Sequence, residues 1–151
     1  SDVAFDGAGN LLVVSETSGS YPGYTSLYGS GEYALHKFSG SGNLLWVRQG
    51  NPVSGIVVPR GLDVDSQGNI LLGLMSMLPN ATYTDIGDLA GTGLKLDDDG
   101  ATQVWLRNIL PGTVWSSTVD ADDNLILGGR IYEGTYPSYT SLRGIVAKYH
   151  P

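Results

Sequence analysis

An internal repeat constrains this chain more than any other feature of its 151 residues. A unit of roughly 53 to 59 residues occurs nearly three times in the sequence. Each copy opens with an apolar alternation, an acidic turn and then Leu or Ile. The turns are Asp6-Gly7-Ala8-Gly9-Asn10, Asp65-Ser66-Gln67-Gly68-Asn69 and Asp120-Ala121-Asp122-Asp123-Asn124. Gly or Asn in such a turn supplies the positive φ of a tight hairpin, so each unit is expected to begin with a β-hairpin.

The second half of the unit predicts two more strands. One carries Lys37, Lys95 or Lys148, the only three lysines of the protein, and the next carries Trp46 or Trp105 in the first two units. A long aromatic loop separates the halves. Its sequence over residues 21–27, Tyr-Pro-Gly-Tyr-Thr-Ser-Leu, recurs over residues 136–142 as Tyr-Pro-Ser-Tyr-Thr-Ser-Leu, with a weaker echo over residues 83–86. Each unit therefore predicts a four-stranded meander, and the third unit stops after its third strand.

The predicted strands lie at corresponding places in the units. They cover residues 3–6, 11–14, 33–38 and 44–48 in the first unit, and 62–65, 70–74, 93–96 and 103–107 in the second. Four-stranded units at this spacing are typical of propeller blades. The expected fold is all-β, a β-propeller segment of about three antiparallel blades in one domain. Blade 1 spans about residues 1–56, blade 2 about 57–112, and blade 3, which lacks its outer strand, about 113–151.

Several repeated motifs resemble a known family. The motifs Asp2-Val3-Ala4-Phe5-Asp6, Gly9-Asn10-Leu11, Ala147-Lys148-Tyr149 and Gly42-Asn43-Leu44-Leu45-Trp46 are similar to the SBBP repeat, a bacterial β-propeller repeat. Residues 58–65, Val-Pro-Arg-Gly-Leu-Asp-Val-Asp, resemble the related NHL repeat. The resemblance implies an extracellular, cell-surface or periplasmic protein without an assigned chemistry. Asp123 departs from the pattern because Gly is usual there, and Asp97-Asp98-Asp99-Gly100 replaces a shorter turn.

Three blades do not complete a ring. A blade buries both faces against neighbours, and a closed ring takes about four to eight blades. An open end exposing on the order of 500 Å² of apolar surface costs roughly 12 kcal/mol, comparable with the stability of about 5 to 15 kcal/mol of a whole domain. We therefore expect the remaining blades of a larger propeller, or other copies of the chain, to cover both ends. The start at Ser1, without Met or a signal-like segment, also suggests a piece of something longer.

Composition argues against several function classes. A net charge of −7, from 15 acidic and 8 basic residues, offers no electrostatic footprint for nucleic acid. Apolar runs such as residues 11–14 are far shorter than the about 20 residues that span a bilayer, so no transmembrane segment is expected. Without cysteine the chain has no disulfide or thiolate site. His36 and His150 lie outside any zinc-protease pattern, and no nucleophile-elbow motif occurs, which makes an enzyme the less favoured hypothesis.

One face of the predicted disc is the candidate ligand-binding face. Meander connectivity places the aromatic loops there together with Arg60 and Trp115, which hold equivalent positions just before the first strand of their units. Exposed Tyr and Trp suit sugars or another protein. The predicted ligand-binding residues are Tyr21, Tyr24, Arg60, Tyr83, Trp115, Tyr136 and Tyr139. The alternative is that these aromatic side chains only pack the loops onto the blades.

The acidic turns suggest a calcium site, since Asp and Asn oxygens at alternate positions can surround this cation. The candidate ligands are Asp63, Asp65, Asp97, Asp99, Asp120 and Asp122. No turn completes an EF-hand-like spacing, so ordinary turn-forming Asp is the alternative. No other cofactor is indicated. Asn80 begins a lone glycosylation sequon, which is short enough to arise by chance.

The remaining large side chains predict structural roles. Trp46 and Trp105 are expected to fill the outer gap between blades. The aligned lysines, together with Arg48 and Arg107, are expected to lay their stems over neighbouring blades and to keep their charges in water.

Three functions remain open at this point. The favoured one is a non-enzymatic extracellular or surface module, a binding or scaffolding propeller that contacts protein or glycan through its aromatic loops. The second is a hydrolase or lyase with an axial site that uses Arg60 and acidic loop residues, among which are Glu16, Glu32 and Glu133. The third is a purely structural subunit of a larger assembly.

Overall fold

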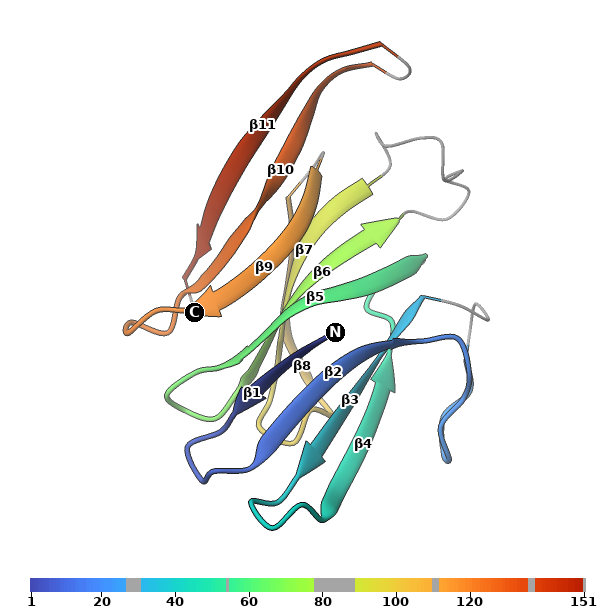
Figure 1. The fold of residues 1–151 in the computed structure, drawn as a ribbon, viewed down its shortest axis with the longest axis vertical. Helices are drawn as coiled ribbons and strands as arrows, with labels where there is room; N and C mark the ends of the chain where they lie inside the picture. Colours follow the sequence, from blue (N-terminus) through green and yellow to red (C-terminus); the bar gives the residue numbers. More distant parts are fainter. Residues whose placement is uncertain (27–30, 54, 78–88, 110–111, 136–137, 151) are drawn as a thin grey trace.

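The computed structural model describes residues 1–26, 31–53, 55–77, 89–109, 112–135 and 138–150. These residues form eleven β-strands and no helix, and the strands make three antiparallel sheets (Figure 1). The first sheet contains β1 (Asp2–Phe5), β2 (Leu11–Thr17), β3 (Glu32–Phe38) and β4 (Leu44–Gly50). The middle sheet contains β5 (Ile56–Val64), β6 (Ile70–Met77), β7 (Leu89–Leu96) and β8 (Gln103–Ile109). The third sheet contains β9 (Gly112–Val119), β10 (Leu125–Thr135) and β11 (Ser138–Tyr149).

Each sheet is a meander in which consecutive strands pair. The predicted all-β class is confirmed, with antiparallel sheets of four, four and three strands. In the part of the chain that the structure describes, no helix is long and apolar enough to cross a membrane. The first strand of the middle sheet starts at Ile56 rather than near Leu62. Pro59 is tolerated within it because β5 is an edge strand of its sheet, and a β-bulge follows between Pro59 and Gly61.

The acidic turns are built alike in the three sheets. Asp6 Oδ1 accepts hydrogen bonds from the backbone N–H groups of Ala8 and Asn10, at 2.9 and 2.8 Å. Asp65 and Asp120 accept the equivalent pairs of bonds in their own turns. The residue before the Asn needs a positive φ, and Asp123 adopts 63° where the other two turns have Gly. Its carboxylate accepts hydrogen bonds from Ser66 of the neighbouring turn, which helps to hold it in this conformation.

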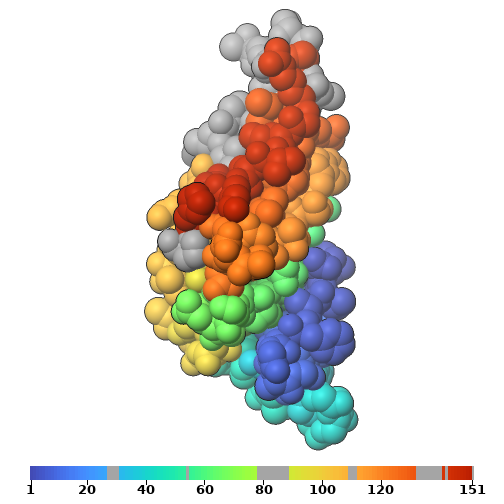
Figure 2. Space-filling model, turned by 90° about the vertical axis from the view of Figure 1, so that its left-hand side faces the viewer, coloured from blue at the N-terminus to red at the C-terminus, as the bar shows by residue number. Residues whose placement is uncertain are grey.

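The sheets stack face to face in chain order, and Figure 2 shows the third sheet at one end of the long molecule and the first sheet at the other. Strand β5 packs on the first sheet, and β9 packs on the middle sheet. Alternate residues of β6 serve the two interfaces, because Ile70 and Leu72 join the core with the first sheet while Leu71 joins the core with the third. The middle sheet is therefore buried on both faces.

An ion pair links the third strand of each sheet to its first turn. Lys37 lies 2.9 Å from Asp6, Lys95 2.7 Å from Asp65, and Lys148 2.7 Å from Asp120. The expectation that the lysine charges stay in water is wrong for Lys37 and Lys95, whose side chains are only 15% and 6% exposed. Burial is possible because a turn carboxylate, itself fixed by backbone N–H groups, lies opposite each ammonium group.

Hydrogen bonds between side-chain carboxylates and backbone N–H groups also join the first strands of adjacent sheets. Asp2 Oδ2 accepts a hydrogen bond from the Leu62 N–H at 3.0 Å, and Asp63 Oδ2 accepts one from the Val119 N–H at 2.8 Å. Gly61 permits β5 to approach β9 closely, because a Cβ there would lie 2.5 Å from the backbone nitrogen of Ser117. Each interface thus combines an apolar core with carboxylate-to-backbone hydrogen bonds near the first strands.

Candidate ligand-binding site

Two of the predicted binding residues lie at β-bulges on the first strands of adjacent sheets. The pairing of β5 with β6 skips Arg60, and the pairing of β10 with β9 skips Trp115. Both residues therefore lie inside their strands, whereas the sequence placed them just before the strands. A bulge re-aims the side chain of its extra residue. The repeat thus brings an arginine and a tryptophan to equivalent, irregular positions.

Arg60 and Trp115 meet, and a third residue joins them. The guanidinium carbon of Arg60 lies 5.4 Å from the centroid of the Trp115 ring, and that of Arg130, on β10, lies 4.9 Å from it. Both distances are within the range of a cation–π interaction. Trp115 is still 50% exposed. We refer to Arg60, Trp115 and Arg130 as the arginine–tryptophan cluster.

Sequence reasoning missed Arg130 because the repeat carries no signal for it. The equivalent positions of the first and middle sheets hold Glu16 and Met75. No pattern within the third unit marks Arg130 either, since it follows two glycines in the middle of a strand. Only the packing of β10 beside β9 shows that its side chain reaches Trp115.

The cluster concentrates positive charge in a protein of net charge −7. The Arg60 side chain makes no hydrogen bond or ion pair with any residue that the structure describes, and its Nε is buried without a hydrogen-bond partner among them. A buried donor without an acceptor costs about 1 to 3 kcal/mol. The Nη groups of Arg60 are not among the buried atoms, so they are the donors that an oxygen acceptor of a ligand can reach. A carboxylate fits best, because its two oxygens match the planar guanidinium group.

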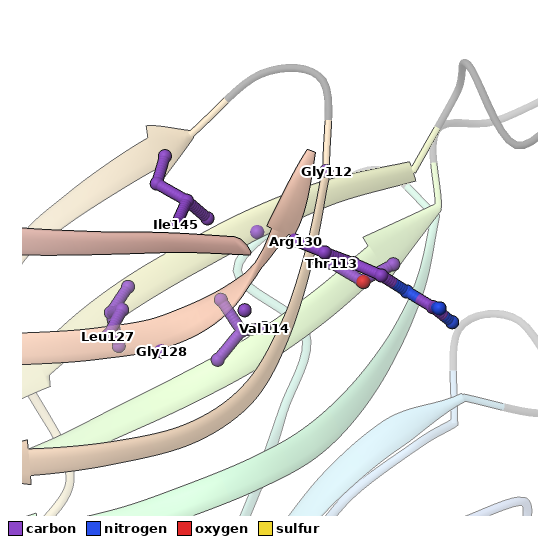
Figure 3. A pocket seen from close by; sticks show the side chains of 9 residues that line it. Gly112, Thr113, Val114, Leu127, Gly128, Arg130 and Ile145 are labelled. Atoms are coloured by element: carbon purple, nitrogen blue, oxygen red, sulfur yellow. The ribbon is translucent and has the colours of Figure 1, made fainter. Parts of the chain in front are cut away.

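A narrow crevice lies beside the cluster, between β7 and the three strands of the third sheet (Figure 3). Its lining consists of Gly91, Gly112, Thr113, Val114, Leu127, Gly128, Gly129, Arg130 and Ile145. Figure 3 shows the Arg130 side chain extending away from Ile145 and Leu127. The crevice holds only about 10 Å³, and at Gly129 the strands are so close that a Cβ would lie 2.0 Å from the Thr113 carbonyl oxygen. We therefore assign ligand contact to the exposed cluster and not to the crevice.

The aromatic loop of the first sheet packs onto its own sheet. The Tyr24 hydroxyl donates a hydrogen bond to the Val47 carbonyl oxygen at 3.0 Å. The ring of Tyr21 meets the ring of His36 edge-on, with 5.1 Å between centroids. Both tyrosines are half-buried. Tyr83, Tyr136 and the side chain of Tyr139 lie outside the described residues, as do Asn80 and the side chain of Glu133.

A buried polar pair anchors that loop. Gln49 Nε2 donates to Glu32 Oε2 at 2.6 Å and to the Gly19 carbonyl oxygen at 3.0 Å. Gln49 Oε1 accepts from the Tyr21 N–H at 2.9 Å. Glu32, which the sequence placed in a loop, is therefore a structural residue at the start of β3, and it is only 2% exposed.

The Asp residues that were candidate calcium ligands take part in several different contacts within the protein. Asp65 and Asp120 face lysines, and Asp63 accepts from the Val119 N–H in the interface between sheets. Asp97 and Asp99 both accept from the Ala101 N–H in their own turn. The Asp122 N–H donates to Asp120. Among the described residues, no three acidic or histidine side chains are grouped so that they could hold a metal ion.

The lysines keep the turn carboxylates ionised. Burial raises the pKa of Asp6, but hydrogen bonds from Asn10 and Lys37 outweigh it and leave the pKa well below its usual value. The pKa of Asp65 is lowered in the same way, since Lys95 and Asn69 outweigh burial. The hydrogen bond from Lys148 is the main cause of the lowered pKa of Asp120. A calcium ion at these turns would compete with the ammonium groups.

No protein-family model matches the chain, and no curated protein matches it. Among solved structures, the chain is similar to a protein of unknown function from Bacteroides caccae, with 10% sequence identity and a TM-score of 0.37. The match covers 94% of this chain and 59% of that protein. The chain therefore spans less than two thirds of the length of that protein.

Proposed function

We propose that this chain is part of a β-propeller of the SBBP or NHL-like type. The threefold repeat supports this, as do meander sheets that stack face to face with their first strands adjacent. We further propose that it is a non-enzymatic binding or scaffolding module in an extracellular, cell-surface or periplasmic protein. The location follows only from the family resemblance of its motifs.

The observation that carries the binding proposal is the arginine–tryptophan cluster. It combines a half-exposed aromatic ring with Arg60, a cation that has no hydrogen-bonded or ion-paired partner in the described part of the chain. A flat apolar surface beside guanidinium groups fits a partner that presents a carboxylate next to an apolar patch, on a protein or a glycan. The cluster replaces the aromatic loops as the centre of the predicted ligand face, because Tyr21 and Tyr24 make packing contacts.

The enzyme alternative receives less support from the same site. A hydrolase or lyase of the kind considered above needs carboxylates close to Arg60. Within the described residues, Arg60 forms no ion pair with a carboxylate. We therefore propose binding and not catalysis as the role of the cluster.

The test measures how tightly the chain binds acidic polymers and whether this binding depends on the cluster. Polygalacturonate and poly-glutamate are the acidic probes, and neutral dextran is the reference. We expect the acidic probes to bind in preference to dextran, and Arg60→Ala or Trp115→Ala to weaken that binding about tenfold or more, as the loss of one charge-assisted contact implies. Arg107→Ala is the matched control, since Arg107 is exposed and also lies on a tryptophan, Trp105, at 5.8 Å. Equal effects of Arg60→Ala and Arg107→Ala would contradict the proposal.

A structural role in a larger assembly is the second candidate, and a specific observation favours it. Large apolar side chains remain exposed on the outer faces of the first and third sheets, among them Val3 at 58%, Phe5 at 69% and Val146 at 76%.

A further inference from the structure

The repeat gives every sheet two faces of distinct character. The side of a sheet that packs on the preceding sheet is called its leading face. The side that packs on the following sheet is called its trailing face. Leu72 of the middle sheet and Leu127 of the third are leading-face residues at one repeat position, 0% and 1% exposed. Lys95 is a trailing-face residue, and the third sheet covers it. The fold therefore makes one kind of interface twice, always trailing face to leading face.

The leading face of the first sheet has this character but lies open. Val3 is 58% exposed, whereas Leu62, at the same repeat position of the middle sheet, is 4% exposed. Leu11 is half-buried, although its equivalent in the third sheet, Leu125, is fully buried. Phe5 is 69% exposed on the same side. The first sheet thus presents an apolar surface of the kind that elsewhere packs on a trailing face.

The trailing face of the third sheet is also exposed, although its equivalents in the other two sheets are covered. Val146 is 76% exposed, whereas Leu35, at the same repeat position of the first sheet, is fully buried by the middle sheet. The Lys148 side chain is 45% exposed, against 6% for Lys95. Both differences have one cause, which is that no described sheet covers this face.

We propose, on the basis of the propeller architecture proposed above, that two copies of this 151-residue chain associate head to tail, with the trailing face of the third sheet of one copy on the leading face of the first sheet of the other. Each copy carries both halves of an interface that the fold already makes twice, so the new contact continues an established one. Two such contacts between two copies would cover the open leading face and the open trailing face of both, so a closed dimer is the smallest assembly that leaves neither face open. Such a contact is heterologous, because different surfaces of the two copies meet.

The geometry makes a specific complementation test possible. Phe5→Asp damages only the leading face of the first sheet, and Val146→Asp damages only the trailing face of the third. Both side chains are largely exposed in the isolated chain, so neither substitution is expected to unfold it. Val104→Asp is the matched control. Val104 is 53% exposed and lies on β8, the outer strand of the middle sheet, and both faces of the middle sheet are already covered.

Mass is measured by analytical ultracentrifugation over a concentration series, and thermal melting checks that each variant folds. We expect a dimer for the unmodified chain and for Val104→Asp, a monomer for each face variant alone, and a dimer when the two face variants are mixed, because one undamaged interface is then available. A chain that stays monomeric up to about 1 mM, the range of the weakest specific contacts, would overturn the proposal. It would also be overturned if only one of the two face variants abolished the dimer, since that pattern indicates contact between like faces. Failure of this test leaves the binding proposal intact, because the cluster residues are not substituted.

Discussion

The Lys95–Asp65 and Lys148–Asp120 pairs occupy the same repeat position, at nearly the same distance, in very different surroundings. The Lys95 side chain is 6% exposed and that of its partner 0%, whereas the values for Lys148 and Asp120 are 45% and 24%. The local sequence does not cause this difference, because both turns begin with Asp and end with Asn. The neighbouring sheet causes it. The comparison shows that a unit of this repeat fixes its own pairing but depends on the next unit for its burial.

The largest expected effect comes from breaking the buried pair. Lys95→Met should lower the free energy of unfolding by about 3 to 5 kcal/mol, because it leaves the Asp65 carboxylate buried without its cation. Lys148→Met should change stability little, since water and salt already screen the exposed pair. Urea unfolding of the two variants measures the difference. Equal losses would mean that the third sheet does not cover Lys95.

A second comparison tests the apolar part of the same interface. Leu125 and Leu11 are the same residue at the same repeat position, but Leu125 is fully buried and Leu11 is half-buried. Leu125→Ala should cost about 2 to 5 kcal/mol through lost burial and the cavity that it leaves. Leu11→Ala should cost less than half as much when the chain is dilute enough to be monomeric. A larger loss for Leu11→Ala in the dilute chain would contradict the assigned stacking order.

Acid should weaken the stack through the turn carboxylates. The pKa values of Asp6, Asp65 and Asp120 lie below their usual value in the folded chain. The unfolded chain therefore binds more protons in acid, so the stabilisation is present above about pH 4 and is lost as the pH falls further. Unfolding free energies measured from pH 7 down to pH 3 should be nearly level at first and then decline. A decline that begins well above pH 5 would show that other groups control acid stability.

The sequence predicted the parts of the fold that depend on local rules and on repetition. The alternation around Leu11 and Leu12 and the Asp-to-Asn turns indicated the hairpins, and the aligned lysines indicated equivalent strands. The burial of the lysine ammonium groups could not be predicted, because it depends on which carboxylate lies opposite each of them in the folded sheet. The cluster was predicted in part. Arg60 and Trp115 share a repeat position, but Arg130 has no repeat equivalent that could have indicated its role.

The most direct test of the stacking account compares the chemical reactivity of the three lysines. Each lies at the same repeat position, so the rate of acetylation, followed by peptide mass spectrometry in dilute solution, reports burial by the following sheet. The account predicts that Lys148 reacts fastest, Lys37 more slowly and Lys95 slowest, in the order of their side-chain exposures of 45%, 15% and 6%. Equal rates for the three lysines, or faster reaction of Lys95 than of Lys148, would contradict it.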